Sequence, residues 1–117
     1  MEYRELGKSG LKISRVGFGG IPIQKIDKEQ TKVLLRYLME QGVNYIDTAR
    51  GYTVSEEYIG YALQGIRDRF VLATKSFART ADAMEKDIQI SHIYNAVEAA
   101  KNQSPIRNEY STPIIVL

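Results

Sequence analysis

The order of apolar and polar positions predicts alternating strands and helices along most of this chain. Residues 43–47 and 69–75 are short, nearly continuous apolar runs, which are typical of strands buried on both faces. Residues 27–41 and 55–64 instead repeat their apolar positions at helical spacing, and a third helical stretch begins at Thr80. Strands that alternate with helices through short connections favour an α/β fold with a parallel sheet.

The predicted helix ends carry residues suited to those positions. Asp27 and Gln30 form an approximate capping box at the start of the first helix, and Gly42 supplies a left-handed stop. Ser55 is expected to cap the second helix, which Gly65 would end. The buried face of the first helix is expected to comprise Leu34, Leu35, Leu38 and Met39.

Two features precede the first helix. Residues 3–6 and 11–14 flank a Gly-Lys-Ser-Gly turn and predict a β-hairpin. The following segment, VGFGGIP, predicts a short buried strand whose glycines let backbone or a ligand approach closely. As a dinucleotide-binding fingerprint it breaks at Pro22, so a glycine-rich strand end with a tight bend is the alternative.

The pattern becomes irregular toward the carboxyl terminus. Beyond Gln103 the sequence SPIRNEYSTPIIVL carries two of the three prolines, and Ile114 to Leu117 could form a strand or an apolar tail. Before residue 102 there is no linker-like composition, so the 117 residues are expected to form a single domain.

Composition excludes several classes of function. The formal net charge of +2 comes from basic residues spread along the chain, which gives no nucleic-acid signature. There is no cysteine and one histidine, so no metal site is expected. No stretch approaches the ~20 apolar residues of a membrane span, and no secretory signal is visible, so we expect a cytoplasmic protein without membrane contact.

Candidate chemistry lies at the ends of the two apolar runs. Asp47 and Lys75 end successive predicted strands, and Tyr52 lies on the loop after the first. The carboxyl ends of parallel strands share one rim, so these side chains are expected to meet. A lysine cation lowers the pKa of a nearby phenol, which helps the phenol protonate a carbonyl oxygen. The alternative is an ordinary Asp–Lys ion pair beside a surface tyrosine.

The chain resembles the N-terminal part of the aldo-keto reductase family in three segments that have the family's order and spacing. These segments are MEYRELGKSGLKISRVGFGG, GVNYIDTARGYTVSEEYIG and FVLATKS. The resemblance covers residues 1–91 and leaves a divergent tail at 92–117. Two segments, GFGGIPIQ and ATKSFARTADAMEKDI, are most similar to a bacterial branch of the family whose members often carry an iron–sulfur segment. The resemblance implies part of a (β/α)₈ barrel, with the hairpin closing its bottom and about three to four βα units present.

The resemblance also implies site residues and a cofactor. The family's members are NAD(P)H-dependent carbonyl reductases, and their set of Asp, Tyr, Lys and His is matched here at Asp47, Tyr52 and Lys75. Gly19 and Gly20, together with Asp47, would line the nicotinamide side of an NADPH pocket. The histidine of the family's fourth strand has no counterpart, because His92 falls within the third predicted helix.

These observations lead to two expectations for the chain. By resemblance it is an oxidoreductase that transfers hydride to a small aldehyde or ketone. Little or no turnover is expected of this truncated chain, because it has fewer than half of the ~250 residues of a complete barrel. The alternative is a non-catalytic barrel remnant that acts through self-association or a partner polypeptide. An open sheet of three or four parallel strands would leave an apolar edge exposed, which favours a homo-oligomer.

Overall fold

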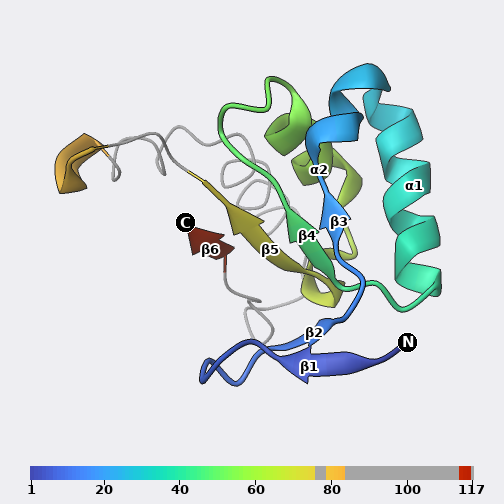
Figure 1. The fold of residues 1–117 in the computed structure, drawn as a ribbon. Coiled ribbons are helices and arrows are strands. Elements are labelled where there is room, and N and C mark those ends of the chain that lie inside the picture. The colour runs from blue at the N-terminus through green and yellow to red at the C-terminus, as the bar shows by residue number, and fades with distance from the viewer. Residues whose placement is uncertain (76–78, 84–113, 117) are drawn as a thin grey trace.

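The computed structural model describes residues 1–75, 79–83 and 114–116. Those residues form a β-hairpin and a separate parallel sheet with two α-helices (Figure 1). The sheet and the helices alternate along the chain, as the apolar pattern predicts. In chain order the elements are β1 (Tyr3–Glu5), β2 (Lys12–Ser14), β3 (Phe18–Gly19), η1 (Ile21–Lys25), α1 (Lys28–Glu40), β4 (Tyr45–Asp47), α2 (Ser55–Ala62), η2 (Arg67–Arg69), β5 (Val71–Thr74) and β6 (Ile114–Val116).

The predicted hairpin is confirmed, and it is attached to the amino end of β4. Strands β1 and β2 pair antiparallel, with Tyr3 opposite Ser14. The side chain of Asn44, directly before β4, accepts a hydrogen bond from the Ser14 backbone amide at 2.7 Å and donates to the Lys12 carbonyl at 2.9 Å. The Tyr3 hydroxyl donates to the Gly42 carbonyl at 2.8 Å. The hairpin therefore lies at the end of the sheet where the strands begin (Figure 1).

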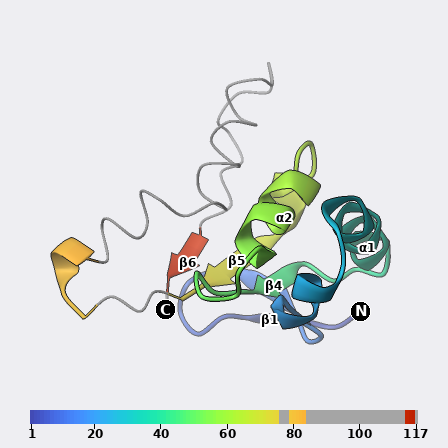
Figure 2. The same ribbon diagram turned by 90° about the horizontal axis from the view of Figure 1, so that it is seen from above.

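The sheet is parallel throughout, in the order β3-β4-β5-β6. Helix α1 connects β3 to β4 and α2 connects β4 to β5, and both helices lie on the same side of the sheet (Figure 2). Gly19 pairs with Asp47 and Asp47 with Ala73, so β3, β4 and β5 are aligned at their carboxyl ends. Within the described ranges, β3 and β6 form the outer edges of a sheet that is not closed.

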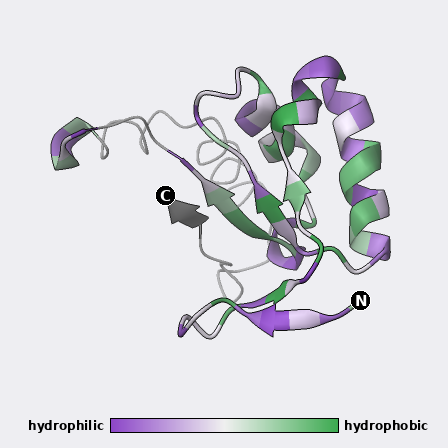
Figure 3. Cartoon of the chain, viewed as in Figure 1, coloured by the Kyte–Doolittle hydropathy of each residue, from purple (hydrophilic) through white to green (hydrophobic). Residues whose placement is uncertain are grey.

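The hydrophobic core lies between the sheet and the two helices. It combines one face of α1, the inner face of α2 and alternate positions of the strands, and Figure 3 shows this apolar layer. Its buried members are Ile23, Leu35, Ile46, Ile59, Ala62, Leu63, Ile66, Phe70 and Leu72. Burial of this apolar surface is the main source of the fold's stability.

The ends of α1 agree with the sequence prediction. The Asp27 carboxylate accepts from the Gln30 amide at 2.8 Å while the Gln30 side chain accepts from the Asp27 amide at 3.0 Å, which completes the capping box. Gly42 has φ +82°, a backbone conformation that a residue without a Cβ adopts at little cost. The chain can therefore turn sharply from α1 into β4.

Three local predictions need correction. Ser55 does not cap α2: Val54 takes that position, and the Ser55 hydroxyl donates instead to the Gly20 carbonyl at 2.9 Å. Strand β3 is not buried, because Phe18 is half-buried and Gly19 exposed at the edge of the sheet. On α1 only Leu35 of the expected face is fully buried; Leu34, Leu38 and Met39 are half-buried.

The carboxyl-terminal predictions are partly resolved. Residues 114–116 form β6, which pairs parallel with β5, so the strand alternative for this segment is confirmed. The third predicted helix is described at residues 81–83 alone, where the Thr80 hydroxyl accepts from the Ala83 amide at 3.1 Å. The rest of that prediction lies outside the described residues. Across the described ranges no helix has the length and apolar character to cross a bilayer.

Candidate active site

Asp47 and Lys75 meet at the carboxyl ends of β4 and β5. Asp47 is the last residue of β4, and Lys75 directly follows β5. The Lys75 ammonium donates a hydrogen bond to the Asp47 carboxylate and forms an ion pair with it. A second hydrogen bond, 3.0 Å long, runs from Lys75 Nζ to the Thr48 carbonyl. Each of the two side chains remains about a third exposed, at 36% for Asp47 and 37% for Lys75, so the pair is accessible from solvent.

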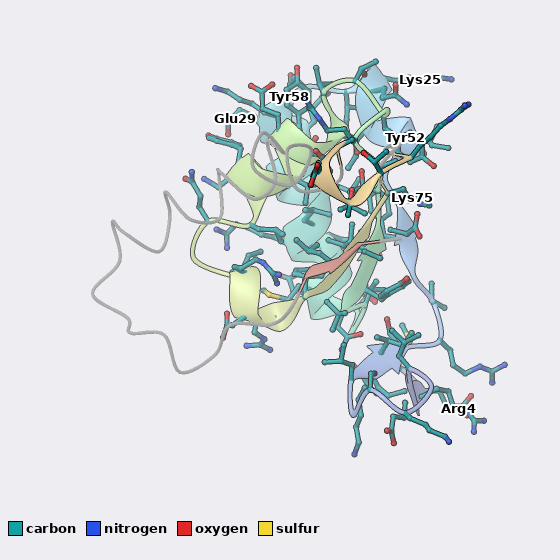
Figure 4. The ribbon with its side chains drawn as sticks, turned by 90° about the vertical axis from the view of Figure 1, so that its left-hand side faces the viewer. Arg4, Lys25, Glu29, Tyr52, Tyr58 and Lys75 are labelled. Carbon is teal, nitrogen blue, oxygen red and sulfur yellow. The ribbon has the colours of Figure 1, made fainter. Side chains whose placement is uncertain are left out.

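Tyr52 is held beside this ion pair by the turn between β4 and α2. Its amide donates to the Ala49 carbonyl at 3.0 Å, and its own carbonyl accepts from the Ser55 amide at 2.8 Å. The Lys75 ammonium lies 5.5 Å from the centre of the Tyr52 ring, within the range of a cation–π contact. Figure 4 shows Tyr52 and Lys75 together at one end of the sheet, opposite the hairpin that carries Arg4.

The residue after Tyr52 has an unusual backbone conformation. Thr53 has φ +44°, in the left-handed region that β-branched residues rarely adopt. Its hydroxyl donates to the Gln24 side chain at 3.0 Å, which connects this turn to η1. A conformation of this kind costs about 1–3 kcal/mol and is found most often at functional sites. The turn therefore stores strain beside Tyr52.

The surroundings of Lys75 alter the pKa of its ammonium group. Burial by itself lowers the pKa of the Lys75 ammonium. The hydrogen bond to Asp47, the charge of that carboxylate and the neighbouring Tyr52 together outweigh burial, and the net pKa lies above its ordinary value. Lys75 is therefore a cation at neutral pH, held against the carboxylate and beside the phenol.

The two glycines of the rim differ in their surroundings. A Cβ built on Gly19 would meet no atom within 4 Å, and the residue pairs with Asp47, so the space beside that carboxylate is open. A Cβ on Gly20 would lie 2.6 Å from the Ser55 hydroxyl and 2.8 Å from the Thr48 hydroxyl. Gly20 is therefore required by packing, and its assignment to a cofactor pocket stays a prediction.

Sequence reasoning missed a layer of buried polar side chains directly behind the rim. The hydroxyls of Thr48 and Ser55 lie 2.8 Å apart, and the Thr74 hydroxyl donates to the Glu56 carboxylate at 2.6 Å. All four side chains are buried. The available signal was the position of the two threonines, each adjacent in sequence to a proposed site residue at the end of a buried strand.

Two further predictions concern histidine and metal. His92, judged a poor candidate for the family's fourth site residue, lies outside the described residues. Within the described ranges no group of three or more His, Cys, Asp or Glu side chains is arranged to hold a metal ion.

Comparisons with known proteins agree with this architecture. The uncharacterized oxidoreductase YqkF of Bacillus subtilis is 35% identical over 115 residues, which are 94% of this chain and 37% of that protein. A probable voltage-gated potassium channel subunit beta of Arabidopsis thaliana is 32% identical over 107 residues, 86% of this chain and 33% of that protein. The chain thus spans about a third of the length of these curated relatives.

Solved structures show the same likeness. An aldo/keto reductase of Klebsiella pneumoniae in complex with NADP and acetate has a TM-score of 0.63 and 26% identity, over 78% of this chain and 32% of that one. An aldo-keto reductase of Bacillus halodurans in its holo form has a TM-score of 0.65 over 99% of this chain and 50% of that one, and its 24% identity shows the fold alone. The model of the aldo/keto reductase family matches residues 15–108, a span that includes Asp47, Tyr52 and Lys75. This chain belongs to the aldo/keto reductase family, and its parallel sheet matches part of that family's barrel.

Proposed function

We propose that this chain supplies the Asp–Tyr–Lys part of a carbonyl reductase site, in which Tyr52 is the proton donor and NAD(P)H the hydride source. One observation carries the proposal: the Lys75 ammonium contacts the Asp47 carboxylate and lies 5.5 Å from the Tyr52 ring at the carboxyl ends of parallel strands. Active sites of barrel enzymes lie at that end of the strands.

The chemistry follows from the charges of the three side chains. The Tyr52 hydroxyl donates its proton to the substrate's carbonyl oxygen, which becomes an alcohol. Lys75, a cation beside the ring, stabilises the phenolate that remains. Asp47 holds the ammonium in place through their ion pair, and the Thr48 carbonyl fixes it from a second direction at 3.0 Å.

The rim suits the nicotinamide end of the cofactor. Gly19 pairs with Asp47 across the sheet, and the space beside Gly19 is open. A flat ring can therefore approach the backbone there. When bound, NAD(P)H supplies the hydride that reduces the carbonyl carbon. Two solved relatives from Klebsiella pneumoniae are described in complex with NADP and with NADPH, which makes NADPH the first cofactor to test.

A titration of the purified chain with NADPH tests the proposal. We expect quenching or enhancement of NADPH fluorescence at up to millimolar concentration, and slow, saturable turnover of a reactive aromatic aldehyde. Tyr52→Phe should abolish turnover and leave NADPH binding intact. Tyr37→Phe is the matched control, because that tyrosine is exposed on α1. Absence of any cofactor binding at millimolar NADPH would contradict the proposal.

A second candidate function is non-catalytic assembly with another polypeptide. It is favoured by the position of β3 and β6 as outer strands of a sheet that is not closed within the described residues. Val16 and Ile21, on either side of β3, are 58% and 56% exposed, so two large apolar side chains lie beside this edge of the sheet. A well-behaved monomer at high protein concentration, measured by sedimentation, would contradict this candidate.

A further inference from the structure

Glu56 is a carboxylate in an unexpected environment. It lies in the first turn of α2, beside the exposed Glu57, but its own exposure is 2%. Charged groups in an interior require hydrogen-bonding partners, because burial without them costs several kcal/mol. The Thr74 hydroxyl is one such partner, at 2.6 Å, and it is itself only 6% exposed.

The position of Thr74 makes this contact relevant to the candidate site. Thr74 is the last residue of β5, and Lys75 follows it directly. Side chains alternate between the faces of a strand, so Thr74 points toward α2 while the next residue points to the opposite face. That residue reaches Asp47. The Glu56 carboxylate therefore fixes, from behind, the end of the strand that carries the Lys75 ammonium.

The neighbouring residue of α2 makes equivalent contacts with the other two strands. The Ser55 hydroxyl donates to the carbonyl of Gly20, just after β3, and lies 2.8 Å from the hydroxyl of Thr48, just after β4. The first two residues of α2 thus contact the carboxyl ends of β3, β4 and β5. The ion pair of Asp47 and Lys75 extends from two of those three ends.

We propose that Glu56 and Thr74 are positioning residues that hold Lys75 against Asp47 and Tyr52. The effect of this positioning on the reaction rate rests on the reductase function proposed above. Neither side chain touches the reacting atoms. Loss of their hydrogen bond would let the end of β5 shift, and displacements near 1 Å in an active site can lower rates by roughly 100-fold.

The experiment uses two variants that break this contact without changing the charge of the protein. Thr74→Val removes the hydroxyl and keeps the side-chain shape, and Glu56→Asp withdraws the carboxylate by one methylene. Thr74→Ser should restore the contact. Glu57→Asp is the matched control, since it makes the same change one residue along on an exposed side chain. The second disrupting variant keeps the test informative if the first fails to fold.

The first readout is the titration of Lys75 in the full chain without cofactor, followed by NMR with labelled lysine and assigned from its loss in Lys75→Met. We expect the titration of Lys75 to move to lower pH in Thr74→Val and Glu56→Asp, because its contact with Asp47 weakens. The Thr74→Ser and Glu57→Asp proteins should titrate like the unmodified chain. An unchanged Lys75 titration in every folded disrupting variant overturns the proposal.

The second readout is aldehyde reduction with NADPH. We expect kcat to fall roughly 10- to 100-fold in the disrupting variants, with the KM for NADPH little changed, because the defect is in orientation and not in binding. Failure of the unmodified chain to reduce aldehydes would contradict the proposed function, while the Lys75 titration would still decide whether the two residues position the lysine.

Discussion

At the scale of single residues, Gly19 and Gly20 allow the strongest prediction, because their surroundings are opposite. Gly19→Ala places a Cβ in open space beside Asp47, so the free energy of unfolding should stay within about 1 kcal/mol of its original value. Gly20→Ala forces a Cβ to within 2.6 Å of the Ser55 hydroxyl and should destabilise the chain by roughly 1–3 kcal/mol. Urea unfolding of the two variants measures this difference.

The same pair separates packing from ligand binding. A larger side chain in Gly19→Val should still fold, but it would occupy the space proposed for the nicotinamide and weaken NADPH binding. If that variant binds NADPH as the unmodified chain does, the cofactor does not approach this part of the rim. If Gly20→Ala is as stable as Gly19→Ala, the packing described around Thr48 and Ser55 is incorrect.

Lys75 supports a prediction of pH dependence at the same scale. Its pKa in the folded chain lies above the ordinary value of 10.5, despite the opposing effect of burial, because of Asp47 and Tyr52. A raised pKa adds stability that is fully present below the ordinary pKa and is lost as pH rises through the folded-state value. The chain should therefore lose stability above about pH 10.5, and Lys75→Met should lose less over that window. If the stability of the two proteins falls in parallel as the pH rises, Lys75 contributes nothing to this pH dependence.

Residue-level reasoning from the sequence succeeded where a single contact decides the outcome. Asp47, Tyr52 and Lys75 were predicted to share a rim from the positions of two apolar runs, and the structure brings them together. It failed for Ser55, which is a common capping residue. A capping preference is local, whereas the actual partner of its hydroxyl, the Gly20 carbonyl, is 35 positions away and cannot be read from the neighbouring sequence.

At the scale of elements, α1 offers a direct test of its capping box. The Asp27 carboxylate accepts from the Gln30 amide at 2.8 Å, and helix caps of this kind contribute about 1 kcal/mol. Asp27→Ala should lower the free energy of unfolding by about that amount, whereas Asp27→Asn, which keeps a capping oxygen, should be nearly neutral. Thermal and urea unfolding measure both variants. Equal stability of the two would mean that the cap adds nothing to this fold.

Element-level prediction was reliable for long periodic stretches and weaker for short ones. The first helix, its cap and its glycine stop were all predicted, because many residues of one period support the same conclusion. Strand β3, with two residues, was wrongly predicted as buried. The burial of so short a strand depends on what lies beside the edge of the sheet, which the sequence VGFGGIP does not report; Val16 and Ile21, on either side of it, are exposed.

At the scale of the whole molecule, the open sheet governs how this chain should behave in solution. Among the residues that the structure describes, β3 and β6 are the outer strands, and natural proteins usually protect such edges with charges, bulges or covering elements. Two exposed apolar residues, Val16 and Ile21, flank β3 instead. We therefore expect the chain to self-associate in a concentration-dependent manner, which sedimentation velocity would detect.

A double substitution at that edge identifies the surface responsible. Val16→Lys with Ile21→Lys places cations beside β3, where charge repulsion opposes pairing of one edge with another, so the association should weaken markedly. Val33→Lys with Tyr37→Lys is the matched control, since those side chains are 70% and 58% exposed on α1. If the α1 substitutions dissociate the oligomer and the β3-edge substitutions do not, the outer surface of α1 mediates association. If neither changes it, association runs through a surface other than these two, and the outer edge of β6 becomes the next surface to test.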